Sequence, residues 1–139
     1  MAPIAMGLRR DMTLPLDEVR RRDRDHEDIA TASLPEMRKA GMAVSILKVV
    51  SDMQREGGTI KGRNEPYRVY AIGKGQIAWY HALERMGELR IIRTRGDLRE
   101  HMAQWEAAQD SEAARAKLPV GAILGLEGAG SVMEPDQLG

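Results

Sequence analysis

Three short apolar runs, separated by stretches with helical periodicity, constrain the fold of this chain more than any other feature. Residues 44–50 are rich in β-branched side chains, residues 89–93 form a shorter run, and residues 120–126 are almost continuously apolar. Runs of this length and composition predict β-strands. A strand that is apolar along its whole length is typically buried on both faces, as in a parallel sheet.

Helical patterns alternate with these predicted strands. Residues 34–40 follow Ser33, a candidate N-cap, and stop at Gly41, which predicts a short helix. A longer helical pattern begins at Pro66 and ends at Gly87. Helical spacing places four of its apolar side chains on one face: Ile72, Trp79, Leu83 and Met86.

A third helix is predicted between the second and third strands. Thr94 and Asp97 have the spacing of a capping box, and three apolar residues follow at helical spacing: Leu98, Met102 and Trp105. The polar residues 109–117 read as a connector. This alternation predicts an α/β fold with a parallel sheet and right-handed crossovers, over residues 34–139. Residues 1–33 are expected to be an irregular, charged segment.

The composition excludes several classes of function. The chain has 139 residues with 21 basic and 21 acidic side chains, so a protein that binds nucleic acid by bulk charge is not expected. It has no cysteine, which removes disulfides and thiolate chemistry. No apolar run approaches the roughly 20 residues of a membrane span, and the opening residues are too short and too weakly apolar for a signal peptide. We therefore expect a cytoplasmic protein without membrane contact.

The charged residues 20–28 and the three histidines offer few sites. The charged run is expected to be a solvated loop or surface helix, with a phosphate or nucleic-acid patch as the alternative. His26 and Asp28 have the spacing of a metal-binding pair, but no strand leads into them, so a loop histidine is favoured over a ligand. His81 and His101 fall within helical patterns and are expected on the surface or on a helix face.

The carboxyl ends of the predicted strands are the places where ligands bind in parallel α/β folds. Ser51 and Asp52 follow the first strand, residues 94–97 follow the second, and Glu127 closes the third before Gly128. A carboxylate is costly to bury there unless it is paired or bound to a metal. Spacing alone leaves two interpretations of Glu127 open. It is either a metal ligand or a glutamate that ends a strand before a glycine turn. The glycines nearby match neither a dinucleotide fingerprint nor a P-loop.

Four segments, in the same order along the chain, resemble the membrane (renal-type) dipeptidases and their bacterial relatives. The residues that carry the resemblance are 120–129 with 135–138, the helix at 33–41, the segment 11–20, and the helix around 75–80. The Leu126-Glu127-Gly128-Ala129 element is moderately specific. The occurrence of all four segments in the order in which the family has them is more specific than any single segment.

The resemblance implies a zinc dipeptidase with a (β/α)8 barrel. In the family, two zinc ions at the carboxyl face are held by an early His-x-Asp pair, a bridging glutamate after the third strand and two later histidines. They activate a water molecule that attacks the peptide bond of a dipeptide. Carried over, Glu127 is the bridging, catalytic carboxylate, and the chain is a partial barrel of roughly three βα units with parallel strands.

The chain also departs from the family. A full barrel needs about 250 residues, so 139 residues are expected to be an N-terminal part that is trimmed at both ends. Pro3 stands where the aspartate of the first ligand pair would be. His26 and Asp28 lie too close to the 33–41 helix to replace that pair, so no metal role is transferred to them.

The sequence therefore predicts a metallodipeptidase that hydrolyses dipeptides with a zinc-activated water, and an isolated chain that is incomplete and inactive. One alternative is a non-catalytic α/β interaction module that completes itself by association. Open sheet edges would favour such self-association. Another alternative is a small free-standing α/β ligand-binding domain.

Overall fold

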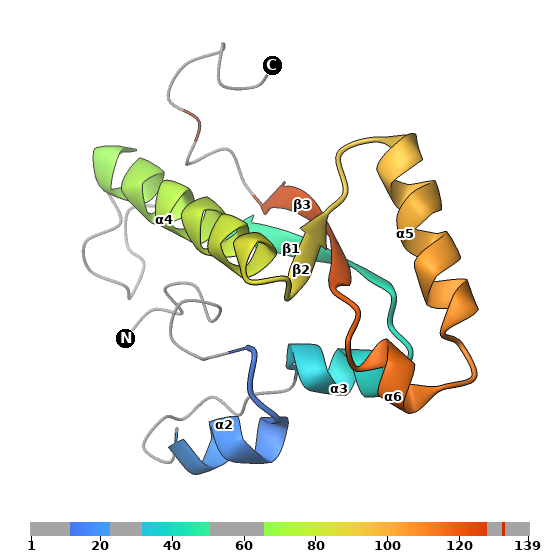
Figure 1. Ribbon diagram of the computed structural model, residues 1–139. Coiled ribbons are helices and arrows are strands. Elements are labelled where there is room, and N and C mark those ends of the chain that lie inside the picture. The colour runs from blue at the N-terminus through green and yellow to red at the C-terminus, as the bar shows by residue number, and fades with distance from the viewer. Residues whose placement is uncertain (1–11, 23–31, 51–65, 128–131, 133–139) are drawn as a thin grey trace.

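The computed structural model describes residues 12–22, 32–50, 66–127 and 132 (Figure 1). Its elements in chain order are α2 (Leu16–Arg22), α3 (Leu34–Lys39), β1 (Val44–Val50), α4 (Pro66–Arg85), β2 (Leu89–Ile91), α5 (Arg95–Ala107), α6 (Glu112–Arg115) and β3 (Val120–Glu127). All three expected strands and the three expected helices are present, which confirms the predicted α/β class. The short helices α2 and α6 lie where an irregular segment and a connector were expected.

The three strands form one parallel sheet in the order β1-β3-β2. β1 pairs with β3 along its whole length, from Val44 opposite Gly121 to Val50 opposite Glu127. β2 pairs only with the beginning of β3. The parallel arrangement confirms the prediction, but three consecutive barrel strands would place β2 in the middle. The order differs because the chain after α5 enters the sheet between β1 and β2, and the sheet of the described residues is open.

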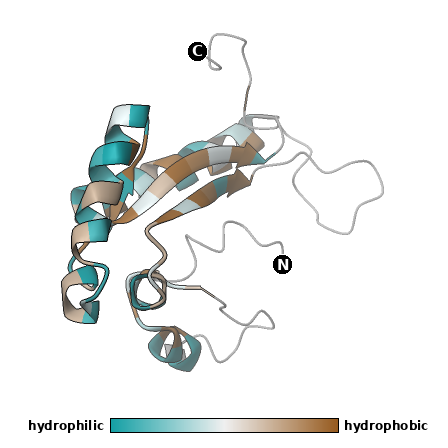
Figure 2. Ribbon diagram, turned by 90° about the vertical axis from the view of Figure 1, so that its right-hand side faces the viewer, coloured by the Kyte–Doolittle hydropathy of each residue, from teal (hydrophilic) through white to brown (hydrophobic). Residues whose placement is uncertain are grey.

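The long helices α4 and α5 lie on opposite sides of the sheet (Figure 1). On the face toward α4, Val49 and Ala122 belong to the main core together with Leu83 of the helix. On the other face, the ring of the buried His101 in α5 lies against Gly121, at the beginning of β3. Figure 2 shows the strands as largely apolar ribbons between more polar helices.

Two glycines end helices in the left-handed region of the backbone. Gly41 follows α3 with φ 74°, and Gly87 follows α4 with φ 78°. At the second of these turns, the N–H of Glu88 donates to the carbonyl oxygen of Leu83 at 3.0 Å, which is the Schellman arrangement. Both predicted helix ends are thus confirmed. Ser33 occupies the N-cap position of α3, but its side chain makes no capping hydrogen bond.

The burial of the central strand differs from the prediction. β3 is buried only at its beginning, whereas Ile123 is 39% and Leu126 is 45% exposed. The adjacent Ile46 of β1 is 65% exposed. Leu126 lies on the face toward α4. On the opposite face, which holds Ile46 and Ile123, α5 covers the beginning and no described element covers the rest. The prediction of a strand buried on both faces is therefore wrong for the second half of β3.

The predicted apolar face of α4 is confirmed in part: Trp79 packs against the core and Ile72 is half-buried. Leu83 is fully buried as expected, but Met86 is exposed at the end of the helix. The buried positions also include the polar side chains of Gln76 and Tyr80. Among the residues that the structure describes, no helix combines the length and the apolar character needed to cross a lipid bilayer.

Candidate functional site

Glu127 lies at the carboxyl end of a parallel strand, as the residue pattern predicted. It is the last residue of β3 and is in register with Val50, the last residue of β1. Its side chain is 49% exposed, and its Oε2 lies 3.0 Å from Nζ of Lys48. A surface ion pair of this kind contributes about 0–1 kcal/mol. Glu127 is therefore a solvated carboxylate beside a lysine, and no burial cost demands a metal ion next to it.

The described residues do not assemble a metal centre around Glu127. In the part of the chain that the structure describes, no three His, Asp or Glu side chains lie close enough together to hold a metal ion. The ammonium group of Lys48, which lies 3.0 Å from Oε2 of Glu127, repels cations. His26 and Asp28 lie outside the described residues. Of the ligands that the resemblance implies for a two-zinc site, the described residues include at most the carboxylate of Glu127, and by themselves they do not fit that site.

Neither of the two described histidines reaches Glu127. His101 is fully buried, with its Nε2 2.8 Å from the carbonyl oxygen of Ala43, so of the two expected positions it has the one on a helix face, here the face of α5 toward the sheet. It lies against the opposite end of β3 from Glu127. His81 stays near the surface of α4, where its Nδ1 lies 3.5 Å from Oε2 of Glu84.

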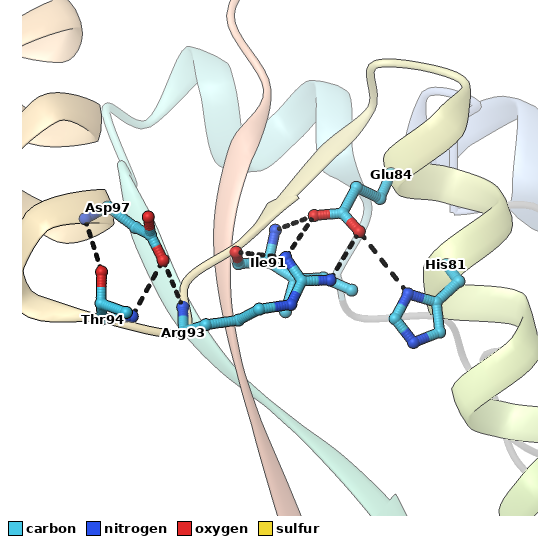
Figure 3. Close-up of polar contacts among 6 residues, drawn as sticks. All are labelled: His81, Glu84, Ile91, Arg93, Thr94 and Asp97. Atoms are coloured by element: carbon cyan, nitrogen blue, oxygen red, sulfur yellow. Dashed lines mark hydrogen bonds and ion pairs between the residues drawn. The ribbon is translucent and has the colours of Figure 1, made fainter.

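A second set of charged side chains lies where the chain leaves β2 (Figure 3). The two carboxylate oxygens of Glu84, near the end of α4, accept hydrogen bonds from Nη1 and Nη2 of Arg93 at 3.1 and 2.9 Å. Oε1 of Glu84 also accepts from the backbone N–H of Ile91 at 2.9 Å. The hydrogen bond from Arg93 is the main reason why the pKa of Glu84 is lowered to about 2. The same carboxylate raises the pKa of Arg93.

The first turn of α5 continues this set through a capping box. Oδ2 of Asp97 accepts from the backbone N–H of Arg93 at 3.0 Å and of Thr94 at 2.9 Å. In return, Oγ1 of Thr94 accepts from the N–H of Asp97 at 3.1 Å. The backbone donors lower the pKa of Asp97. The predicted capping box is confirmed, and it fixes the turn between β2 and α5.

The Glu84–Arg93 pair is suited to holding the chain in place rather than to proton transfer. A carboxylate that accepts from both terminal nitrogens of one guanidinium stays ionised and is a weak base. Sequence reasoning found Thr94 and Asp97 because the capping box has a fixed spacing. It missed Glu84 and Arg93, because a pair formed across a helix end and a strand has no fixed spacing.

A cavity of about 230 Å³ lies between α4 and the carboxyl half of the sheet. Its lining is mainly apolar and includes Val49, Ile77 and Leu124. Among the described residues that line it, the one charged side chain is Lys74, whose Nζ lies 5.3 Å from the centre of the Tyr70 ring. The cavity has room for a small apolar group, but it does not bring together the polar side chains that chemistry would need.

No protein-family model, no curated protein and no solved structure matches the chain. The residues and their arrangement are therefore the basis for any inference about its function.

Proposed function

We propose that this chain is part of an α/β barrel of the membrane dipeptidase type, with Glu127 as a metal-binding carboxylate of the whole enzyme. The observation that carries the proposal is the position of Glu127 at the carboxyl end of the central parallel strand. Active sites of barrels lie at this end of the strands. The cytoplasmic location expected from the sequence is part of the same proposal.

The uncovered half of the sheet supports the proposal. Glu127, Gly125 and Ile123 alternate along β3, so their side-chain positions share the face opposite α4. The exposed Ile46 lies in register with Ile123 on the same face. In a barrel, helices cover the outer face and the inner face meets side chains of other strands. Only the carboxyl half of this face lacks a covering helix among the described residues, as the inner face of an incomplete barrel would. α5 covers the beginning of the same face, which departs from the barrel arrangement.

The strand order requires one adjustment to the barrel proposal. β1 and β3 pair over seven register positions and would be neighbouring strands of the barrel wall. β2 has three residues and pairs only with the beginning of β3. We therefore assign β2 to a short strand outside the barrel wall. The second half of β3 then keeps an edge at which a further barrel strand would pair.

Zinc would supply the activated water in a complete enzyme, and Glu127 would supply one of its ligands. In this chain Lys48 neutralises that carboxylate. The described residues form no group of three or more His, Asp or Glu side chains that could hold a metal ion. We therefore expect the isolated chain to bind zinc weakly and not to hydrolyse dipeptides.

The first test is hydrolysis of dipeptides by the purified chain, with added zinc and with a chelator as the control. We expect no turnover. Turnover that the chelator abolishes would contradict the expected lack of ligands, and His26 and Asp28 would become the first candidates.

A chimera gives the positive test of the role of Glu127. Residues 34–127 would replace the matching segment of a bacterial zinc dipeptidase, and the chimera should hydrolyse dipeptides in a chelator-sensitive manner. Glu127→Gln should abolish this activity, whereas the same exchange at the exposed Glu106 should not. A folded, active chimera that tolerates Glu127→Gln would contradict the assignment.

The second candidate function is an interaction module that completes its sheet by association, and one observation favours it. β2 covers only the first three residues of β3, so the backbone groups of Leu124 and Leu126 point toward an edge without a strand in the described part of the chain. Size-exclusion chromatography with light scattering tests this function. A discrete oligomer would support it, and a monomer at all concentrations would contradict it.

A further inference from the structure

The outer edge of β1 differs from the open edge of β3. In a parallel strand, the N–H and C=O of one residue point to the same side, and the side alternates along the chain. The N–H of Gly121 donates to the carbonyl oxygen of Ala43 at 2.7 Å. The backbone groups of Ala43 therefore point toward β3. Because Lys48 and Val50 lie an odd number of residues further along the strand, their backbone groups point away from β3.

Two side chains of α4 bind these outward groups. Oε1 of Gln76 accepts from the N–H of Val50 at 3.0 Å, and Nε2 of Gln76 donates to the carbonyl oxygen of Val50 at 2.8 Å. The hydroxyl of Tyr80 donates to the carbonyl oxygen of Lys48 at 3.0 Å. Both side chains are buried on α4, together with the predicted Leu83.

The spacing of these contacts follows from the two elements. Gln76 and Tyr80 are one helical turn apart and lie about 6 Å apart along the helix axis. Lys48 and Val50 are alternate strand residues and lie about 6.6 Å apart. A glutamine amide also carries one acceptor and a donor in the geometry of a peptide group, so it can bind both groups of Val50 as a neighbouring strand would.

We propose that Gln76 and Tyr80 form an edge cap, which takes the place of a neighbouring strand on β1 and prevents β1 from pairing with β1 of a second copy of this chain. Two copies present identical edges, and a two-fold axis lets such edges pair with each other. β1 is rich in β-branched residues, and Ile46 is 65% exposed, which are features that favour edge pairing. The edge cap is independent of the proposed metal site.

The test removes the hydrogen bonds while keeping the volume of the side chains. In the double variant Gln76→Met and Tyr80→Phe, the N–H of Val50 loses its partner. Its hydrogen exchange should become faster by about tenfold. Analytical ultracentrifugation should show larger assemblies at concentrations at which the wild type does not form them. Tyr67→Phe, at an exposed position of the same helix, is the matched control and should change neither measurement.

A third substitution separates edge pairing from general unfolding. Ile46→Lys added to the double variant places two like charges near the two-fold axis of a β1–β1 contact, so it should reverse the assembly while the fast exchange of Val50 persists. Assembly that stays at the wild-type level in the double variant would overturn the proposal, whether or not the exchange of Val50 becomes faster. Assembly that Ile46→Lys leaves unchanged would overturn it as well, because unfolded chains would then cause it.

Discussion

Gly121 is a residue at which a side chain of α5 packs closely against the sheet. A Cβ atom at this position would lie 2.7 Å from Nε2 and 2.9 Å from Cδ2 of His101, and 3.0 Å from Cγ2 of Val44. His101 cannot move away easily, because it is fully buried and its Nε2 contacts Ala43. Glycine is therefore needed at position 121 for close packing rather than for an unusual backbone angle.

We expect Gly121→Ala to lower the free energy of unfolding by about 1–3 kcal/mol, because the extra methyl group overpacks this contact. Urea denaturation measures the change. Gly125→Ala is the matched control in the same strand, since the nearest atom to its new Cβ would be Cγ2 of Ile46 at 3.4 Å. A similar loss of stability in both variants would contradict the role given to His101.

Glu84 gives the stability of the protein a dependence on acid pH. Its pKa of about 2 in the folded protein lies below the value of about 4.3 for a free glutamate. A carboxyl group with a lowered pKa stabilises the folded state above its unfolded pKa, and this contribution is lost as the pH falls toward the folded pKa. The side chain is partly exposed, so we expect a contribution of about 1–2 kcal/mol after solvent screening.

Urea denaturation of the wild type and Glu84→Gln between pH 2 and pH 7 checks this expectation. The difference in the free energy of unfolding should be largest above about pH 5, and most of it should be lost by about pH 2, near the folded pKa. Arg93→Met removes the main hydrogen-bond donor to Glu84. The free energy of unfolding of this variant should therefore depend less on pH between about pH 2 and pH 5. A difference between wild type and Glu84→Gln that stays constant with pH would show that Glu84 acts through packing alone.

At the scale of elements, Arg38 joins three parts of the fold. It lies in α3 and is buried. Its Nε donates to the carbonyl oxygen of Leu118 at 2.7 Å, just before β3. Its Nη2 donates to the carbonyl oxygen of Glu88 at 3.0 Å and to Oε2 of the same residue at 2.6 Å, just before β2. A single guanidinium group thus sets where both strands begin.

We expect Arg38→Met to cost about 2–4 kcal/mol of stability, because it leaves two carbonyl oxygens and a carboxylate without this donor. Thermal or urea unfolding measures the loss. Arg90→Met is the comparison, since Arg90 forms a largely exposed pair with Glu100 at 2.6 Å and should cost less than about 1 kcal/mol. The opposite ranking of the two variants would contradict the role of Arg38.

Local signals predicted the elements, while contacts between distant segments decided the details. β1 has the predicted bounds, and α3 and α4 end at the glycines that the sequence marked, because these features depend on neighbouring residues. Burial of Gln76 and His101 could not be predicted, because it depends on backbone groups of β1 and on a glycine of β3. A polar residue on an apolar helix face carries no local sign of the strand that will bind it.

At the scale of the whole molecule, the parallel sheet was predictable from alternation, but the strand order was not. The rule for right-handed crossovers permits β3 on either side of β2. The position of Glu127 at the carboxyl end of a strand followed from the sequence. Its exposure and its pairing with Lys48 did not, because they depend on the uncovered half of the sheet.

The central position of β3 has a consequence for the order of folding. The bonds from Gln76 and Tyr80 to β1 join residues 26 and 32 positions apart, so they can form soon after α4 has been synthesised. β3 comes last in the sheet and has to insert between β1 and β2, which are already present. Pairing that waits for such distant segments is slow. Ribosome-bound chains that end before β3 should therefore hold β1 against α4 alone, with the side of β1 that later receives β3 still unpaired.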